Sequence, residues 1–248
     1  MLIIPAIDLL NGKCVRLTQG DFSRSSVYGF DPVETAMIFC RARARLIHVV
    51  DLDAARGTGN NRDVIRDIRA RVTCPIQVGG GIRSAEDIEA LLSFGVERQI
   101  LGTMFIRKPE LVREWVSAYP ARFMASVDAS GGRVKVSGWA GDGGLTSAEA
   151  AALAKETGMR AIVYTDISRD GTLSGPDYEG TAAVARISGL PVILSGGIGS
   201  MEDISAAAAR ETEGIAGVIT GKALYTGAVD LRAAIDSFQK ETEGGIPW

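Results

Sequence analysis

The sequence is poor in the residues that build disulfide frameworks and histidine-dependent sites. Its 248 residues include three cysteines (Cys14, Cys40 and Cys74) and one histidine, His48. An odd number of cysteines without a CxxC spacing supports neither a disulfide framework nor a zinc site, and free thiols favour a cytoplasmic protein. The single histidine excludes a triad of histidines and a histidine-rich metal site.

The chain also lacks an excess of positive charge and a long apolar run. A formal net charge of -3 gives no basic surface of the kind that nucleic acid or an anionic membrane requires, so we expect neither as a partner. The apolar start MLIIPAIDLL has no basic residue before it, is interrupted by Pro5 and Asp8, and is too short for a secretory or membrane-spanning segment. We interpret it as a first strand. With 46% hydrophobic and 23% charged residues, the composition is that of a globular protein with an ordinary core.

Short runs rich in Val, Ile and Leu alternate with helical stretches. Eight such runs begin near Leu2, Leu46, Ile76, Arg98, Phe123, Ala161, Val192 and Ile215. Helices should begin at Pro32, Pro109 and Asp177 and behind the N-caps Ser84, Thr146 and Ser200, and Gly95 and Gly158 fit just past helix ends. Eight strand-helix units over this length predict one (β/α)₈ TIM barrel spanning residues 1–248, and a doubly wound open sheet is the main alternative. We expect only the tail EGGIPW to be loosely held.

Parts of the sequence occur twice. PIQVGGGIRSAEDI, from Pro75, returns 116 residues later as PVILSGGIGSMEDI, with eight of fourteen positions identical. IDLLNGKCV is echoed by VDASGGRVK after 120 residues, and VVDLDAARGTG by YTDISRDGTLSG after 115. These offsets predict two pseudo-symmetric half-barrels, at about 1–120 and 121–240.

The repeats carry aspartates at strand ends. Because the carboxyl ends of barrel strands form the active-site mouth, we expect Asp8, Asp51, Asp128 and Asp166 to converge there. Asp8 and Asp128 follow runs that lie opposite one another, and paired carboxylates suit proton transfer when burial or a neighbour raises the pKa of the donor. For Asp51 and Asp166, a capping role is an equal alternative.

The repeats also carry glycine turns, which let backbone N–H groups approach an anion. We expect two phosphate sites, one for each half. The candidate residues are Gly79, Gly80, Gly81, Gly102 and Thr103 in the first half, and Gly196, Gly197, Gly221 and Lys222 in the second. Acidic residues already fill the first helical turns behind Ser84 and Ser200, so the anions should lie on loop amides and the following short turns.

Strand alternation places His48 on the face opposite to Asp51. If Asp51 points to the mouth, His48 points toward the helices and is structural. Acid-base work then belongs to carboxylates.

Five segments carry a resemblance to a known family. IIPAIDLLNGKCVRL, HVVDLDAA, VGGGIRS, TDISRDGTLSGP and SGGIGSMED resemble the histidine-biosynthesis isomerases that act on phosphoribosylformimino-aminoimidazole carboxamide ribotide, over Leu2 to about Phe238. The resemblance implies a ribulose-phosphate-binding barrel, a small-molecule bisphosphate substrate, no cofactor and no metal. It also implies an Amadori rearrangement of an aminoaldose to an aminoketose. We expect a monomer.

The resemblance also implies roles for individual residues. Asp8 would be the general base and Asp128 the general acid, and Thr165 and Asp170 would support the reacting sugar. Trp139 would stack on the base-like end of the substrate or, as an equal alternative, only cover the barrel mouth. The residues that could meet the charge of the substrate are Arg16, Arg83 and Lys13.

Departures and alternatives remain. Ser126 stands where glycine is usual, AGDGG after Trp139 replaces a bulkier acidic stretch, and Asp177 replaces a common Asn. The sister cyclase of the same pathway is disfavoured by AIDLL and by Val15-Arg16-Leu17. A bifunctional isomerase that also acts on phosphoribosylanthranilate is weakly disfavoured by Gly79, where such relatives tend to have serine. A non-catalytic phosphate-binding barrel is disfavoured by the presence of both Asp8 and Asp128.

Overall fold

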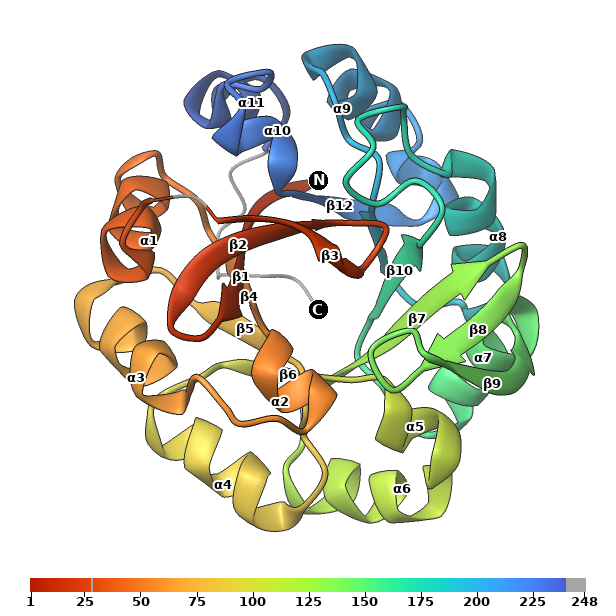
Figure 1. Ribbon diagram of the computed structural model, residues 1–248. Coiled ribbons are helices and arrows are strands. Elements are labelled where there is room, and N and C mark those ends of the chain that lie inside the picture. Colours follow the sequence, from red (N-terminus) through yellow and green to blue (C-terminus); the bar gives the residue numbers. More distant parts are fainter. Residues whose placement is uncertain (28, 240–248) are drawn as a thin grey trace.

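The computed structural model describes residues 1–27 and 29–239, and the side chains of 22–27 lie outside that description. Eight parallel strands close into a barrel by pairing in the circular order β1-β4-β5-β6-β7-β10-β11-β12, and β12 pairs back to β1 (Figure 1). The closed circuit confirms the (β/α)₈ barrel and excludes the open sheet. The barrel strands are β1 (Leu2–Leu10), β4 (Ile47–Asp51), β5 (Ile76–Gly79), β6 (Arg98–Leu101), β7 (Phe123–Ser130), β10 (Ile162–Asp166), β11 (Val192–Ser195) and β12 (Ile215–Thr220).

Helices form a ring outside the barrel (Figure 1). The longer ones are α1 (Pro32–Arg41), α3 (Arg62–Arg71), α4 (Ala85–Ser93), α6 (Pro109–Ala118), α7 (Ser147–Glu156), α8 (Tyr178–Ser188), α9 (Met201–Ala208) and α11 (Leu231–Phe238). The short ones are α2 (Leu52–Arg56), α5 (Thr103–Arg107), α10 (Lys222–Tyr225) and the 3₁₀ turn η1 (Glu211–Glu213). None of the described helices is long and apolar enough to cross a bilayer.

The helix starts follow the predicted signals. Ser84, Thr146 and Ser200 each form a capping box, in which the N-cap hydroxyl accepts from the N3 amide and the N3 carboxylate accepts from the N-cap amide. Asp177 caps α8 by accepting from the Gly180 amide. These caps fix where each helix leaves its loop, and with it the direction of that loop at the mouth.

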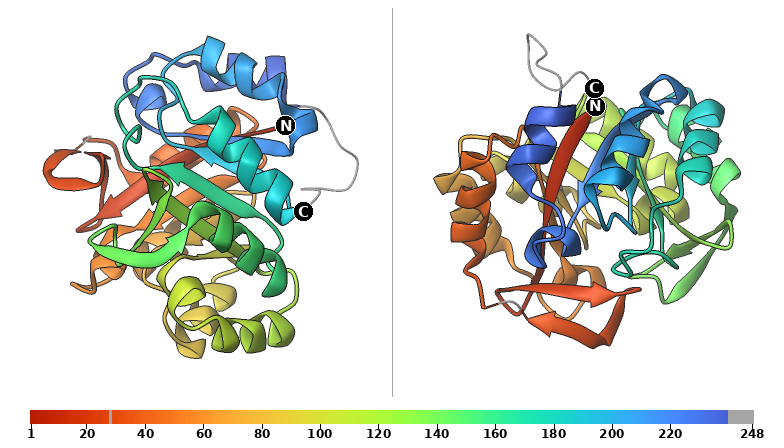
Figure 2. Two further views of the ribbon diagram at one scale, coloured as in Figure 1. Left: turned by 90° about the vertical axis from the view of Figure 1, so that its right-hand side faces the viewer. Right: turned by 90° about the horizontal axis from the view of Figure 1, so that it is seen from above.

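Two hairpins were not predicted. The strands that begin at Leu2 and Phe123 were each expected to lead directly into a helix, but each turns back first, into β2 (Lys13–Thr18) and β3 (Asp21–Val27) or into β8 (Arg133–Val136) and β9 (Gly141–Thr146). The turns explain why: Asn11-Gly12 and Gly131-Gly132 all have positive φ, as a type I′ hairpin turn requires. The right-hand view of Figure 2 shows the β2–β3 hairpin at the end of the barrel opposite to the N-terminus.

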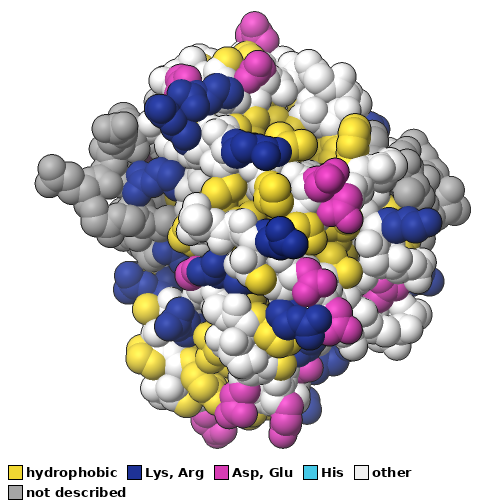
Figure 3. All heavy atoms as spheres, turned by 90° about the vertical axis from the view of Figure 1, so that its left-hand side faces the viewer, with side chains coloured by type: hydrophobic (Ala, Val, Ile, Leu, Met, Phe, Trp, Pro, Cys, Tyr) yellow, Lys and Arg dark blue, Asp and Glu magenta, His cyan; other side chains and the backbone are white. Residues whose placement is uncertain are grey.

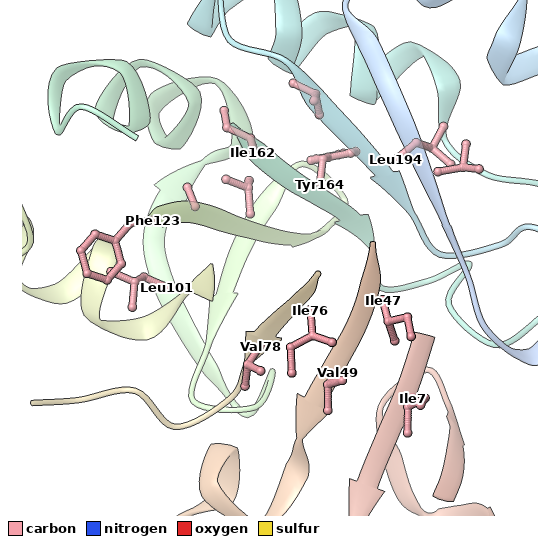
Figure 4. Close-up of a cluster of buried hydrophobic side chains, with 14 of the residues drawn as sticks. Ile7, Ile47, Val49, Ile76, Val78, Leu101, Phe123, Ile162, Tyr164 and Leu194 are labelled. Carbon is pink, nitrogen blue, oxygen red and sulfur yellow. The ribbon is translucent and has the colours of Figure 1, made fainter. Parts of the chain in front are cut away.

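Strand alternation divides the core into two layers. Leu2, Ile4 and Ala6 of β1 belong to a buried cluster that fills the barrel, whereas Ile3 and Ile7 pack against the helices. Figure 4 shows side chains of the outer layer, several of them β-branched, which suits packing on a pleated surface. Above the last interior layer, at the carboxyl end of the strands, the barrel opens into a cavity.

Candidate active site

A cavity of about 240 Å³ opens at the carboxyl end of the barrel, far larger than the ~15 Å³ that one water needs. It is bounded by loops that follow most of the barrel strands. The structure brings the following predicted site residues to its wall: Asp8, Arg16, Gly80, Gly81, Arg83, Gly102, Thr103, Asp128, Trp139, Thr165, Asp170, Gly196, Gly197, Gly221 and Lys222. Lys13, by contrast, is exposed at the start of β2 and does not line the cavity. Placement at one cavity leaves the role of each residue a prediction.

Asp8 faces the cavity in an ion pair. Hairpin pairing of β1 with β2 brings Arg16 beside it, and Arg16 Nη1 donates to Asp8 Oδ2 over 2.6 Å. Arg16 Nη2 donates to the carbonyl of Ala6. Burial alone would lower the pKa of the Arg16 guanidinium, but the Asp8 carboxylate raises it above the ordinary value. Asp8 therefore sits beside a permanent positive charge.

Asp128 faces the same cavity from β7, and none of the described Lys or Arg side chains forms an ion pair with it. Ser126 Oγ lies 3.1 Å from both carboxylate oxygens and donates to them. Burial raises the pKa of Asp128, and this outweighs the hydrogen bonds from Thr165, Trp139 and Ser126 that lower it. The two carboxylates thus have different surroundings: a guanidinium lies beside Asp8, whereas burial favours the protonated form of Asp128.

A third carboxylate lies near both in the same cavity. Asp170, in the loop after β10, has its pKa raised to about 7 by burial and by the nearby charges of Asp8 and Asp128, while Arg16 and Lys222 act against this shift. The Gln19 amide donates to the Asp170 carbonyl over 2.9 Å, which ties this loop to the first hairpin. Three acidic groups therefore share a space with two cations.

The glycine turns have a steric requirement in both halves. Gly80 and Gly196 have φ of +104° and +85°. A Cβ on Gly80 would overlap the carbonyl of Asp51, and one on Gly196 would lie 3.0 Å from the carbonyl oxygen of Asp166. In both halves the glycine turn therefore passes so close to the backbone at the end of the neighbouring strand that only glycine fits.

The candidate anion sites differ in how their amides are occupied. Ser84 and Ser200 already satisfy amides at the starts of α4 and α9, whereas the N-caps of α5 and α10, Gly102 and Gly221, offer no side-chain cap. Both N-cap glycines line the cavity. This arrangement agrees with the expectation that anions lie on the loops and short turns, and their binding stays a prediction.

Asp51 and Asp166 do not line the cavity, so the expectation that four aspartates converge at the mouth is wrong for these two. Asp51 is 2% exposed, caps α2 through the Ala54 amide and accepts twice from Asn61, each over 2.7 Å. Asp166 accepts from the amide and hydroxyl of Ser168. Both aspartates therefore have the capping role that the sequence analysis left open as the alternative.

The prediction that His48 points toward the helices is wrong for the same reason. Since Asp51 points outward, alternation turns His48 into the barrel, where it lines the cavity and lies 3.0 Å from Gln77 Nε2 through Nδ1. Burial, with a contribution from Arg16, lowers the pKa of His48 to about 3, so the imidazole is neutral. A sequence signal could have predicted this inward direction: Asp51 is a favourable N-cap residue directly before the short helix, where it accepts from the Ala54 amide.

Trp139 comes from the second hairpin, in a left-handed conformation with φ of +71°. Its ring lies against Gly20 of the first hairpin, where a Cβ would overlap the indole. The two hairpins therefore meet beside the cavity, which Trp139 also lines. Within residues 1–27 and 29–239, no group of three or more His, Cys, Asp or Glu side chains is arranged to hold a metal ion.

Known proteins similar to this chain share most of its length. The family model described as "Histidine biosynthesis protein" matches residues 2–230. Three relatives carry the name 1-(5-phosphoribosyl)-5-((5-phosphoribosylamino)methylideneamino) imidazole-4-carboxamide isomerase. The one from Synechococcus sp. is 46% identical and covers 95% of this chain and 92% of its own. Those from Trichlorobacter lovleyi and Geobacter sulfurreducens are 47% and 48% identical, and each match covers 95% of this chain and 97% of the relative. The chain therefore belongs to the histidine biosynthesis protein family.

Proposed function

We propose that the protein is the isomerase for which these relatives are named. It would convert an aminoaldose bisphosphate into the aminoketose by an Amadori rearrangement. The observation that carries the proposal is the unequal pair of carboxylates: Asp8 stands beside Arg16, whereas the half-buried Asp128 forms no ion pair with any described residue. An isomerase of this kind needs one group that gives a proton and one that takes it.

Asp128, in its protonated form, would give its proton to the ring oxygen of the ribose as the C1–O bond breaks and the nitrogen lone pair forms the Schiff base. Asp8 would then remove the proton from C2, and the electrons of that C–H bond would form the enol and restore the amine nitrogen. Asp8, now protonated, would return a proton to C1, and Asp128, now ionised, would accept the enol proton, which gives the ketose and restores both carboxyl groups to their starting forms. Atoms and charge balance without a cofactor.

The phosphates of the substrate would occupy the glycine turns of the two halves. Arg83 supplies a cation at the first turn, whereas the equivalent position in the second turn is Gly199, where a Cβ would come within 2.6 Å of the Leu173 carbonyl oxygen. The cation of the second half, Lys222, comes instead from the short helix α10. We propose that this difference orients the substrate.

Two rate measurements test the function. The wild-type protein is given the aminoaldose bisphosphate and phosphoribosylanthranilate in separate assays, and turnover of the first alone is expected. Turnover of both would select the bifunctional isomerase, and turnover of neither, with both compounds bound, would select a non-catalytic barrel.

Asp128→Asn tests the acid. It should lower kcat by about 10²–10⁴-fold, because general acid catalysis contributes that much, while substrate binding stays measurable by calorimetry. Ser126→Ala is the matched control, since it removes a hydrogen bond to Asp128 but keeps the carboxyl group. Near-normal turnover in purified Asp128→Asn would refute the two-carboxylate mechanism.

We further propose a cytoplasmic monomer that binds neither nucleic acid nor membranes. All three cysteines are free, as in a reducing compartment. The face shown in Figure 3 mixes basic and acidic side chains rather than presenting one basic field. Light scattering after gel filtration would measure the mass, and a particle of twice 26.2 kDa would refute the monomer.

A further inference from the structure

Arg16 is sandwiched between the catalytic candidate Asp8 and a side chain that does not reach the cavity. Tyr225, on α10, presents its ring to the guanidinium, with 4.9 Å from Arg16 Cζ to the ring centroid. The Tyr225 hydroxyl donates to the carbonyl of Ala6 over 3.2 Å, the same carbonyl that accepts from Arg16. Ring and hydroxyl thus fix the guanidinium and the strand that carries Asp8.

The guanidinium depends on this support. Arg16 is 8% exposed, and its Nε has no hydrogen-bond partner among the described residues. A cation over an aromatic face is held more strongly when it is desolvated. Gly221 packs closely against the same guanidinium, since a Cβ at this position would lie 2.6 Å from Arg16 Cζ.

The second half of the barrel has an equivalent hairpin and short helix without this pair. Leu9 pairs with Cys14 in the first hairpin, and Ala129 with Val134 in the second, so the 120-residue offset places Val136 where the first half has Arg16. Both short helices follow N-cap glycines, which places Ile106 where the second half has Tyr225. Cation and ring are both replaced by aliphatic side chains at the Asp128 end.

We propose that Tyr225 is a positioning residue that acts through Arg16 and holds the Asp8 carboxylate in the geometry of the general base. The inference rests on the proposed isomerase function. It also explains how a duplicated barrel gives its two aspartates different roles: the Arg16–Tyr225 pair is present at one and absent at the other.

Substitution of the ring tests the inference. Tyr225→Phe keeps the ring and should keep kcat within about 3-fold. Tyr225→Leu and Tyr225→Met remove it and should lower kcat by about 10- to 30-fold, equivalent to about 1.4–2 kcal/mol, with KM within about 2-fold. Tyr178→Leu is the matched control, because it removes a similar contact, 5.3 Å from Arg210 Cζ, on the outside of the molecule. Equal kcat in the Phe and Leu variants, or a loss confined to KM, would overturn the inference.

A measurement without substrate separates this inference from the proposed function. In ¹⁵N spectra, the Arg16 Nε–H signal should exchange slowly with solvent in the wild type and in Tyr225→Phe, and at least about 10-fold faster in Tyr225→Leu. If the wild type shows no isomerisation, the proposed function fails while the spectra still test the contact. An unchanged exchange rate in Tyr225→Leu overturns the positioning role whether or not the enzyme turns over.

Discussion

Replacement of Asp8 by asparagine should affect stability and activity together, and a second substitution should separate the two effects. The side chains of Asp8 and Arg16 are 18% and 9% exposed. Asp8→Asn leaves the guanidinium buried without its anion, and removal of one partner of a buried ion pair costs about 3–5 kcal/mol. We expect the low end, about 3 kcal/mol, because the asparagine oxygen can still accept from Arg16 and the cavity admits water.

In a chain of this size, that loss corresponds to a fall in Tm of about 6–12 °C. Urea unfolding followed by circular dichroism measures it, and a single cooperative transition in the wild type is also what one barrel domain predicts. Asp8→Asn combined with Arg16→Met removes both charges, so it should recover most of the stability. Turnover should stay about 10²–10⁴-fold below the wild type in both variants, since neither has the base.

The control is the same chemical change in an exposed ion pair. Asp236 accepts from Arg232 over 2.6 Å, but the two side chains are 51% and 43% exposed. Asp236→Asn should therefore change stability by less than about 1 kcal/mol and leave turnover alone. The reasoning is refuted if the double variant is as unstable as Asp8→Asn, or if either variant isomerises the substrate at a near-normal rate.

Two further predictions concern the same cavity. Gly221→Ala should lower kcat by about 10-fold or more, because its Cβ would lie 2.6 Å from Arg16 Cζ. Gly102→Ala is the matched control, because Gly102 has similar backbone angles (φ -105°, ψ -84° against φ -122°, ψ -92°) but its Cβ would meet Ser126 only at 3.6 Å, so its effect should be smaller. Equal activity of the two alanine variants would contradict the steric explanation. Asp170 has its pKa raised to about 7 in the folded protein, against an ordinary value of 3.8, so the folded state holds this proton more tightly than the unfolded state. Its contribution to stability is complete below about pH 4 and is lost as the pH rises to about 7, and urea unfolding from pH 4 to 8 should show a flatter pH dependence in Asp170→Asn than in the wild type.

The local elements could be predicted because their causes are local. The capping boxes at Ser84 and Ser200 involve residues three apart, and the barrel strands begin within about a residue of the expected positions. The hairpins carried an equally local signal in Asn11-Gly12 and Gly131-Gly132, two-residue turns of the kind that joins antiparallel strands. The repeat of eight strand-helix units was sufficient to predict the closed barrel.

The sequence by itself determined the architecture and brought the candidate residues to one end of it, because strand polarity alone places every strand end at the mouth. It did not determine which way the strand-end side chains point. Asp51 could equally cap a helix or face the mouth, and only its hydrogen bonds with Asn61 decided this, turning His48 inward. Likewise, nothing near Arg16 in the chain specifies Tyr225, since barrel closure brings them together. The unequal surroundings of Asp8 and Asp128 therefore arise from tertiary contacts, because burial and charge depend on neighbours in space rather than in sequence.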